Sequence, residues 1–390
     1  MPNLIKLESI LAQNLKLHKA KINCISQMII GLITAQSSNL KKIARHFPNT
    51  TQIESNYRRI QRFLAETEID EHQIASLIYN LFGLDKVTLT IDRTNWKWGK
   101  SNINIFMLGV VYKGIAIPLY WDMLDKRGNT NHLERAELIE RFIKQFGKDN
   151  IEMILADREF VGELWFNWLT AHHIPFAIRI KKNSKVVNHH GKLVQIKDLL
   201  RHVSHKETYR HGRILIVDGC AVRVFAKRDK DHGLVIVATN QLQTLDAMTI
   251  YAKRWEIESL FACLKGRGFN LEETHLTKMD RVSKLVAVNA LAFCWAYHVG
   301  IHHDKQRPLK RKPKSNGRPQ ASLFALGLDL LIEGLRLVLL NNDKAVFRQL
   351  VSFLTPKPMK IGWCWFFVVC RDSFYYPHHL VRHAALDIAG

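Results

Sequence analysis

Apolar residues up to about position 80 recur at the three- to four-residue spacing of α-helices. One stripe runs through Ile22, Ile25, Ile29 and Leu32, and residues with this spacing share one face of a helix. The polar residues between them would face solvent or a neighbouring helix. We therefore predict that residues 1–80 form an all-helical segment.

Within this segment, a polar turn separates two short helices, and the second of them is basic. Pro48, Asn49 and Thr50 are typical turn residues, and the helix predicted after them carries Arg58 and Arg59. A helix, a turn and a basic helix resemble a helix-turn-helix that reads DNA. Arg58 and Arg59 are therefore candidate DNA-binding residues. The alternative is a small helical bundle with a solvated basic face.

From Lys86 onward, apolar residues alternate with polar ones or gather in β-branched runs, as is typical of strands. Two amphipathic stretches between these runs have the spacing of helices. The predicted order is β-β-β-α-β-α-β. The strands are expected at 87–92, 103–112, 115–122, 151–156 and 175–180, and the helices at 131–145 and 163–172.

The pattern changes twice more towards the C-terminus. Residues 183–240 are basic, rich in turn residues and alternating, which indicates an antiparallel insertion. Helical spacing returns at Asp246 and continues through most of the remainder. A cationic loop follows, with seven Lys and Arg and no acid between Lys305 and Arg318. The pattern supports no structural prediction for residues 361–390.

The charge balance points to a polyanionic partner. The 390 residues include 57 Lys and Arg against 35 Asp and Glu, which gives a net charge of +22 with neutral His. Such a surplus costs self-repulsion and usually serves to bind a polyanion, nucleic acid before an anionic membrane. The 47% hydrophobic content excludes a mostly disordered chain.

Membrane and zinc sites are not indicated. The longest apolar run, 285–301, is interrupted by Asn289 and His298 and is short for a membrane span, so we interpret it as a buried helix. The N-terminus lacks the compact apolar stretch of a signal peptide. The six cysteines form no Cys-x-x-Cys pair, which suggests neither zinc nor disulfides and fits a reduced cytoplasm.

One helical segment places a carboxylate among cations and a phenol. At 100° per residue, Tyr251, Arg254, Glu258 and Lys265 fall within a stripe about 60° wide, and an apolar stripe lies beside it. Arg254 and Glu258 are also a common solvated i,i+4 pair. The pair by itself therefore does not indicate a functional site, and it does so only together with carboxylates elsewhere in the chain.

Two aspartates lie at or near the ends of predicted strands. Asp92 is followed by Arg93 and Thr94, and Asp157 is followed by Arg158 and Glu159. Each aspartate alone is explained equally well by capping of a turn. Together with Glu258, they form a set of oxygen ligands that suits hard divalent cations. Two such cations can activate the attacking oxygen and stabilise the leaving oxygen of a phosphodiester displacement.

The residues around these carboxylates resemble a known family. Tyr251, Arg254, Glu258 and Lys265 match without departure the signature of bacterial DDE transposases of the insertion-sequence-four family. The settings of Asp92 and Asp157 resemble the two Asp motifs of that family. The resemblance is strong over about 85–300, moderate over the N-terminal helices and poor over the last 30 residues.

The resemblance implies an α/β fold with an RNase H-like core and a β-rich insertion at about 183–240. It implies a helical DNA-binding domain at 1–80, a catalytic domain at 81–300 and a basic loop with C-terminal helices at 301–390. Asp92, Asp157 and Glu258 would be the catalytic, metal-binding residues, holding two Mg²⁺ ions, for which Mn²⁺ can substitute. Tyr251, Arg254 and Lys265 would bind DNA phosphates where a base is flipped out.

The expected function is therefore cut-and-paste transposition by a cytoplasmic bacterial protein. Its partners would be double-stranded DNA, as terminal inverted repeats and target, and a second copy of the chain in a paired-end dimer; no membrane partner is expected. Phe225 is a candidate to stack on the flipped base, because it is aromatic and lies on a predicted strand, whereas Trp255 could serve either the core or DNA. The alternatives are a metal-dependent nuclease on the same fold and a catalytically inert DNA-binding protein.

Overall fold

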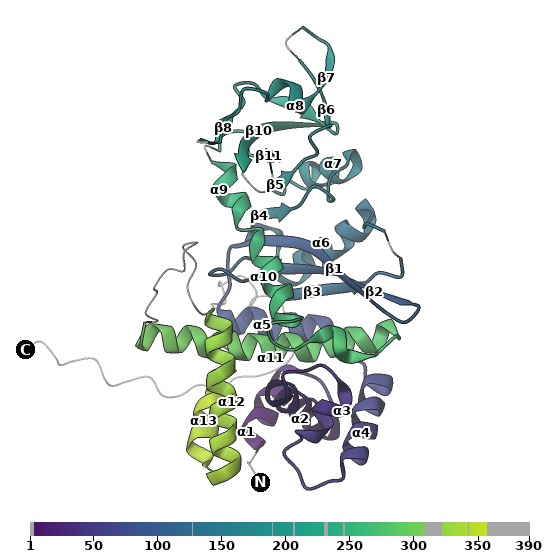
Figure 1. Ribbon diagram of the computed structural model, residues 1–390, viewed down its shortest axis with the longest axis vertical. Coiled ribbons are helices and arrows are strands. Elements are labelled where there is room, and N and C mark those ends of the chain that lie inside the picture. The colour runs from purple at the N-terminus through teal and green to yellow at the C-terminus, as the bar shows by residue number, and fades with distance from the viewer. Residues whose placement is uncertain are drawn as a thin grey trace, which may run out of the picture. The chain divides into compact units, whose positions relative to one another are not determined.

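The predicted switch to alternating residues near position 86 marks the start of a central β-sheet (Figure 1). The computed structural model describes residues 4–126, 128–188, 190–205, 207–229, 233–244, 246–308, 322–341 and 343–356. The first five strands are β1 (Val87–Trp98), β2 (Ser101–Val110), β3 (Ile117–Met123), β4 (Ile151–Ala156) and β5 (Phe176–Arg179). All five strands were predicted from the sequence.

These strands are neighbours in the order β3-β2-β1-β4-β5. The first three form antiparallel hairpins, whereas β4 runs parallel to β1 and β5 runs parallel to β4. Parallel neighbours require a crossover, which is usually helical. The helices α6 (His132–Phe146) and α7 (Glu163–Ala171) supply the two crossovers, as the sequence predicted.

The register of β1 and β4 brings the two sequence-predicted aspartates side by side. Ile91 of β1 pairs with Ala156 of β4, so Asp92 and Asp157 are the next residues along two adjacent parallel strands. Neighbouring strands lie about 4.8 Å apart, and residues at the same level point to the same face. The sheet therefore sets the separation of these two side chains.

The insertion is only partly a separate structure. Strand β11 (Gly233–Thr239) pairs antiparallel with β5, and β10 (Cys220–Asp229) continues the same sheet. The remaining short elements are β6 (Lys185–Val187), β7 (Leu193–Gln195), α8 (Ile196–Leu199), β8 (Tyr209–Arg210) and β9 (Leu215–Val217). Of these, β6 and β7 form their own two-stranded sheet. The predicted antiparallel strands thus mostly extend the central sheet.

The N-terminal segment is helical, as predicted. Its helices are α1 (Ile5–Asn14), α2 (Lys19–Ala35), α3 (Leu40–Arg45), α4 (Ile53–Glu66) and α5 (Glu71–Phe82). Asn39 caps α3 by accepting hydrogen bonds from the backbone N–H groups of Lys41 and Lys42, which satisfies donors that a helix start leaves free. Helices α3 and α4 pack against each other and against α2.

The long helix α11 (Met279–Gln306) ties the N-terminal helices to the sheet (Figure 1). It contacts β3, α2, α4 and α5, and Ser38 donates a hydrogen bond to the fully buried Asn289. By length and composition it is the one helix in the described ranges that could span a membrane, and 89% of its apolar window is buried inside the protein. The predicted buried helix at 285–301 is therefore confirmed.

Two further helices, α12 (Leu323–Asn341) and α13 (Lys344–Ser352), follow. Helix α12 crosses α11 closely because glycines meet at the crossing. A Cβ atom added at Gly300 would lie 1.9 Å from the carbonyl oxygen of Leu323. Residues 4–356 with their gaps belong to one unit, so the domain boundaries near 80 and 300 stay predictions. The tail at 361–390 and most of the cationic loop lie outside the described residues.

Candidate active site

The segment that carries the four-residue signature is two helices, not one. Helix α9 (Ala247–Ala252) ends before Lys253, and α10 (Trp255–Leu264) begins after Arg254. The predicted continuous helix is therefore wrong. Lys253 and Arg254 keep right-handed helical backbone angles, so the chain direction changes little. This explains why the side chains still meet.

Tyr251 of α9 and Arg254, which directly precedes α10, each contact one of the two aspartates. The Tyr251 hydroxyl donates to Asp157 Oδ1 at 3.2 Å. The Arg254 guanidinium contacts Asp92 Oδ2 at 3.4 Å and Glu258 Oε1 at 2.5 Å. The structure thus brings all three predicted carboxylates to one site, with Arg254 bridging two of them.

Lys265 approaches the same site from the far end of α10. Its Nζ donates to the Thr94 hydroxyl at 3.2 Å and pairs with Glu272 at 2.5 Å. Thr94 lies on β1, two residues beyond Asp92, and successive even positions of a strand share a face. Lys265 is therefore held beside the carboxylates, on the same face of the sheet.

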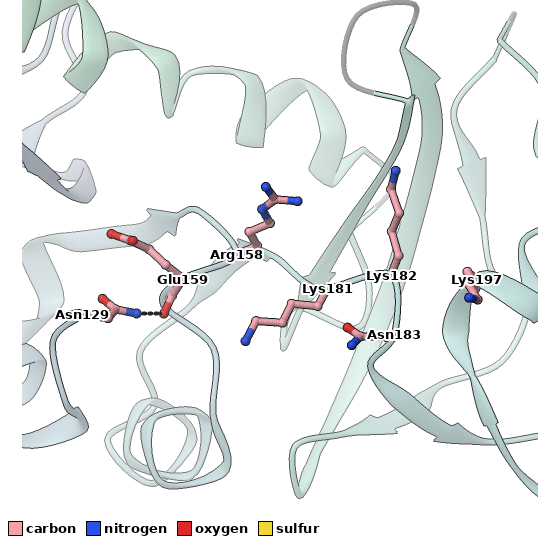
Figure 2. A pocket seen from close by; sticks show the side chains of 7 residues that line it. All are labelled: Asn129, Arg158, Glu159, Lys181, Lys182, Asn183 and Lys197. Carbon is pink, nitrogen blue, oxygen red and sulfur yellow. Dashed lines mark hydrogen bonds between the residues drawn. The ribbon is translucent and has the colours of Figure 1, made fainter.

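Two pockets border the carboxyl ends of β4 and β5. The first, of about 590 Å³, is lined by Asp157, Tyr251, Arg254 and Glu258, and also by the half-exposed Trp255. The second, of about 630 Å³, begins at the next residue, Arg158 (Figure 2). In open sheets with parallel strands, ligands bind beyond the carboxyl ends of the strands, and both pockets lie there.

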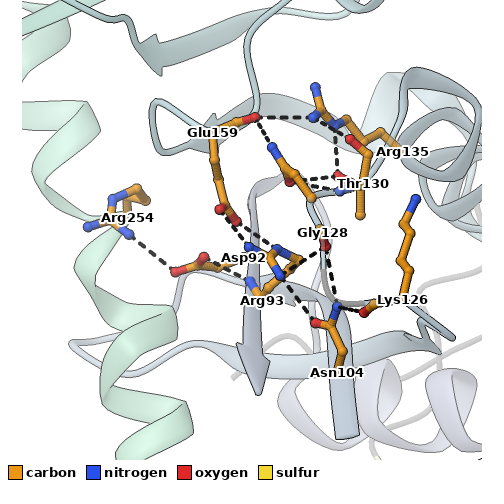
Figure 3. A network of polar contacts seen from close by, with 10 residues as sticks. Asp92, Arg93, Asn104, Lys126, Gly128, Thr130, Arg135, Glu159 and Arg254 are labelled. Atoms are coloured by element: carbon orange, nitrogen blue, oxygen red, sulfur yellow. Dashed lines mark hydrogen bonds and ion pairs between the residues drawn. The ribbon is translucent and has the colours of Figure 1, made fainter. Parts of the chain in front are cut away.

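A network of polar contacts joins the loop that follows β4 to the residues around Asp92 on β1 (Figure 3). Arg93, next to Asp92 on β1, donates to both carboxylate oxygens of Glu159 at 3.0 and 2.9 Å. Bidentate Arg–carboxylate pairs of this kind fix geometry as well as contributing energy. The pair therefore ties the loop after β4 to β1.

The same loop is anchored from its other side by Arg135 of α6. This buried guanidinium donates to the carbonyl oxygens of Thr130 and Glu159 at 2.7 and 3.1 Å. It also lies over the ring of the fully buried Phe160, 5.2 Å from the ring centroid. The residues after Asp157 are thus locked in place by packing and by hydrogen bonds.

Sequence reasoning missed the roles of Arg93, Glu159 and Arg135. A signal for the first two was present, because Arg follows Asp92 directly and Glu159 lies two residues after Asp157. Opposite charges beside two aspartates on adjacent strands are candidates for a cross-strand ion pair. Arg135 gave no comparable signal, since an arginine on an amphipathic helix is usually solvated.

Burial dominates the electrostatics of Asp92. It raises the pKa of this carboxyl to about 7, although the Arg254 guanidinium and the Arg93 backbone N–H act in the opposite direction. Burial likewise raises the pKa of the Tyr251 phenol, so this phenol stays protonated and donates to Asp157. The site therefore holds a carboxyl that is poorly solvated and costly to ionise even with the Arg254 guanidinium beside it.

The stability of the protein is expected to fall as pH rises from about 4 to 7. In this range the folded state retains the Asp92 proton that the unfolded state, with a pKa of 3.8, has released. Asp92→Asn removes this titration and should stabilise the metal-free protein at pH 8 by up to ~4 kcal/mol, since each pKa unit is worth about 1.4 kcal/mol. Urea unfolding in EDTA from pH 5 to 8 measures the effect.

The exposed Asp149→Asn variant is the control for this experiment, because it removes a carboxylate without removing a buried one. Its stability should follow the wild-type pH dependence. An Asp92→Asn protein that loses stability between pH 5 and 8 as steeply as the wild type would contradict the assignment.

The three carboxylates have the donor chemistry that Mg²⁺ prefers, which is oxygen. Over the described ranges, however, no three ligand side chains lie close enough together to hold a metal ion. Instead, the single Arg254 guanidinium contacts both Asp92 and Glu258. The chemistry of the donor set nevertheless fits a divalent cation.

Other sequence-predicted residues have mixed outcomes. Arg58 is exposed on α4, whereas Arg59 is half-buried and donates to Asn23 Oδ1 at 2.6 Å. Phe225 lies on β10 and is fully buried, so its proposed stacking on a flipped base is wrong for this structure, because β10 belongs to the packed sheet. Trp255 is 45% exposed at the pocket, so it is not a core residue.

Three carboxylates on a mixed sheet and helix, lined by cations, define a candidate phosphodiester-processing enzyme. The comparisons with known proteins agree with this class. Residues 83–295 match the family model of the transposase DDE domain, which is more than half of the chain. The chain therefore belongs to the transposase DDE domain family.

Solved structures also resemble the chain, and one of them is a transposase complex. The cryo-EM structure of the piggyBac transposase synaptic complex with hairpin DNA has 9% sequence identity and a TM-score of 0.46, with 88% of this chain and 77% of that chain covered. A likeness at that level supports no detailed argument about this chain. No curated protein matches the sequence.

Proposed function

We propose that the chain is a cut-and-paste transposase of the insertion-sequence-four type. It would bind the terminal inverted repeats of its own element, cleave DNA there and join the ends to target DNA. The observation that carries this proposal is that Arg254 contacts both Asp92 and Glu258, while Tyr251, just before it in the chain, contacts Asp157. Strands and helices distant in sequence converge on this set.

The strand order supports an RNase H-like core. Three antiparallel strands are followed by two parallel ones, in the spatial order β3-β2-β1-β4-β5, and this arrangement is consistent with such a core. Because β1 and β4 are adjacent in this order, their register places Asp92 and Asp157 at the same level of the sheet. Helix α10, which carries Glu258, contacts β1 from outside the sheet.

Asp92, Asp157 and Glu258 would hold the divalent metal, with Mg²⁺ as the physiological ion. When bound, the metal activates the attacking oxygen and stabilises the leaving oxygen of the phosphodiester. The chain's own groups do the rest. Arg254 keeps Asp92 and Glu258 together before loading, and Tyr251 orients Asp157 through its hydroxyl.

Tyr251, Arg254 and Lys265 would then contact phosphates at the cleaved end. Arg254 is 6% exposed, and its Nε has no hydrogen-bond partner in the structure. Arg254 contacts each carboxylate through a single nitrogen, and by exchanging them for a phosphate it would gain a bidentate partner. Trp255, exposed at the same pocket, is the remaining candidate to stack on a flipped base.

The N-terminal helices would add contacts to double-stranded DNA through Arg58, with Arg59 in a supporting position against α2. A bacterial, cytoplasmic protein that works as a homodimer on paired ends fits this function. Helices α12 and α13 are candidates for the dimer contact.

A strand-transfer experiment distinguishes the transposase from a nuclease with the same active site. The protein is incubated with DNA flanking its gene, Mg²⁺ and a supercoiled target plasmid. We expect cleavage at the element ends and joined products, because the same carboxylates serve hydrolysis and transesterification. Products are separated on denaturing gels and the junctions are sequenced.

Reactions with EDTA, and with a duplex of unrelated sequence, are the controls. Cleavage of the flanking DNA without any joined product would replace the transposase proposal by the nuclease. Binding without cleavage in Mg²⁺ or Mn²⁺ would favour the inert DNA-binding protein.

A further inference from the structure

The second pocket beside the active site is strongly cationic and is not explained by the carboxylates. Four basic side chains line it: Arg158 after β4, Lys181 and Lys182 after β5, and Lys197 of α8. Two neutral amides, Asn129 and Asn183, complete the polar lining. None of the four cations forms an ion pair that the structure describes, and all four are exposed.

The one carboxylate at this pocket does not neutralise these cations. Glu159 lines the pocket, but both of its carboxylate oxygens accept hydrogen bonds from Arg93. Figure 3 shows this carboxylate directed toward Arg93 of β1. The pocket therefore carries about four positive charges, and the nearby acid is already paired.

The pocket and the active site share the same two chain segments. Asp157 and Arg179 line the active-site pocket, whereas Arg158 and Lys181 line the cationic one. Asp157 and Arg158 are consecutive residues, so the two pockets border the same turn after β4. Polyanions are drawn to such concentrations of one charge.

We propose that this pocket binds successive backbone phosphates of the DNA strand that enters the active site, and that it does so independently of base sequence. This inference rests on the proposed function, because it takes DNA as the ligand. Lys181, Lys182 and Lys197 supply the principal contacts. Arg158 continues these contacts up to the catalytic Asp157.

The arrangement of the side chains favours a strand over a small anion. In Figure 2 the charged ends of Arg158, Lys181 and Lys182 are spread along the pocket instead of meeting at one point. A single phosphate would need them to converge, whereas a strand offers phosphates at regular intervals. Lysines are flexible point charges that contact phosphates without reading bases.

The test is the salt dependence of DNA binding by a triple variant, Lys181→Gln, Lys182→Gln and Lys197→Gln, in EDTA. Each lost phosphate contact reduces the slope of log affinity against log salt by about one, so the slope should fall by two to three. The fall should be equal for DNA flanking the gene and for an unrelated duplex of the same length. Fluorescence anisotropy from 50 to 300 mM NaCl measures both slopes.

The matched control is the triple variant Lys86→Gln, Lys144→Gln and Lys148→Gln, which removes the same number of positive charges. These three exposed lysines lie near the starts of β1 and β4, at the opposite end of the strands from the pocket. This control should keep the wild-type slope. The triple Lys→Arg variant of the pocket should keep it as well, since charge is preserved. Far-ultraviolet circular dichroism verifies that all variants are folded.

Three outcomes would overturn the proposal: equal slopes for the pocket variant and the control, an effect on only one of the two duplexes, or a loss in the Lys→Arg variant as large as in the Gln variant. None of these measurements requires cleavage. Failure of the proposed transposase activity, measured separately with wild-type protein in Mg²⁺, is therefore distinguishable from failure of this binding site.

Discussion

Asp92→Asn or Glu258→Gln should reduce metal-dependent DNA cleavage by at least ~10³-fold. Loss of a carboxylate ligand weakens a cation whose charge stabilisation is worth several kcal/mol in the transition state, and each 1.4 kcal/mol is a factor of ten in rate. Both substitutions keep side-chain size and a hydrogen-bond acceptor for Arg254. Single-turnover cleavage of labelled DNA in Mg²⁺ measures the rates.

The matched control is Asp122→Asn. Asp122 is a half-buried carboxylate on β3 that pairs with Arg141 at 2.5 Å, outside the active-site pocket. This variant should cleave DNA at close to the wild-type rate. Full cleavage by either active-site variant would falsify the catalytic assignment, provided that DNA binding in EDTA is unchanged in all three proteins.

Affinity for duplex DNA should fall about 10³- to 10⁵-fold between 50 and 200 mM salt. This is the loss expected when 6–10 phosphates are neutralised and their counterions released. The net charge of +22 supplies enough cations, and the structure locates exposed ones at Arg58 and at the cationic pocket. Equilibrium titration of labelled DNA in EDTA gives the slope.

A neutral osmolyte at matched osmolality is the control for this titration and should leave affinity nearly unchanged. A salt slope close to zero would show that the surplus of positive charge does not serve DNA binding. The three pocket lysines should account for two to three units of this slope of log affinity against log salt.

The sequence by itself determined most of the elements. Strand β4 was predicted at its observed bounds because a short β-branched run ends at Asp157 and lies between two helical patterns. Strand β1 continues to Trp98, six residues beyond its predicted end. The polar residues after Asp92 gave no strand signal, and they are extended because they pair with the start of β2.

The sequence also determined the catalytic candidates, because spacing along a helix is a local property. Tyr251, Arg254, Glu258 and Lys265 recur at intervals that place them on one side of a helix, and in the structure they contact Asp157, Asp92 or Thr94, or, for Glu258, Arg254. The break between α9 and α10 could not be predicted. No Gly or Pro marks it, and packing on the strands β1, β5 and β11 accompanies it.

Only the tertiary structure decided which charges meet. Arg254 contacts Asp92 across 162 positions of sequence, and Arg93 contacts Glu159 across 66. The first pair depends on the packing of α10 on β1, and the second depends on the register of β1 and β4. The burial of Phe225 and the cationic pocket likewise depend on how the insertion continues the sheet. The spacing of apolar residues predicts single helices and strands, because it reflects the repeat of one helical turn or one strand pleat. The active site is formed by contacts between elements that are far apart in the sequence, and the spacing within one element carries no information about such contacts.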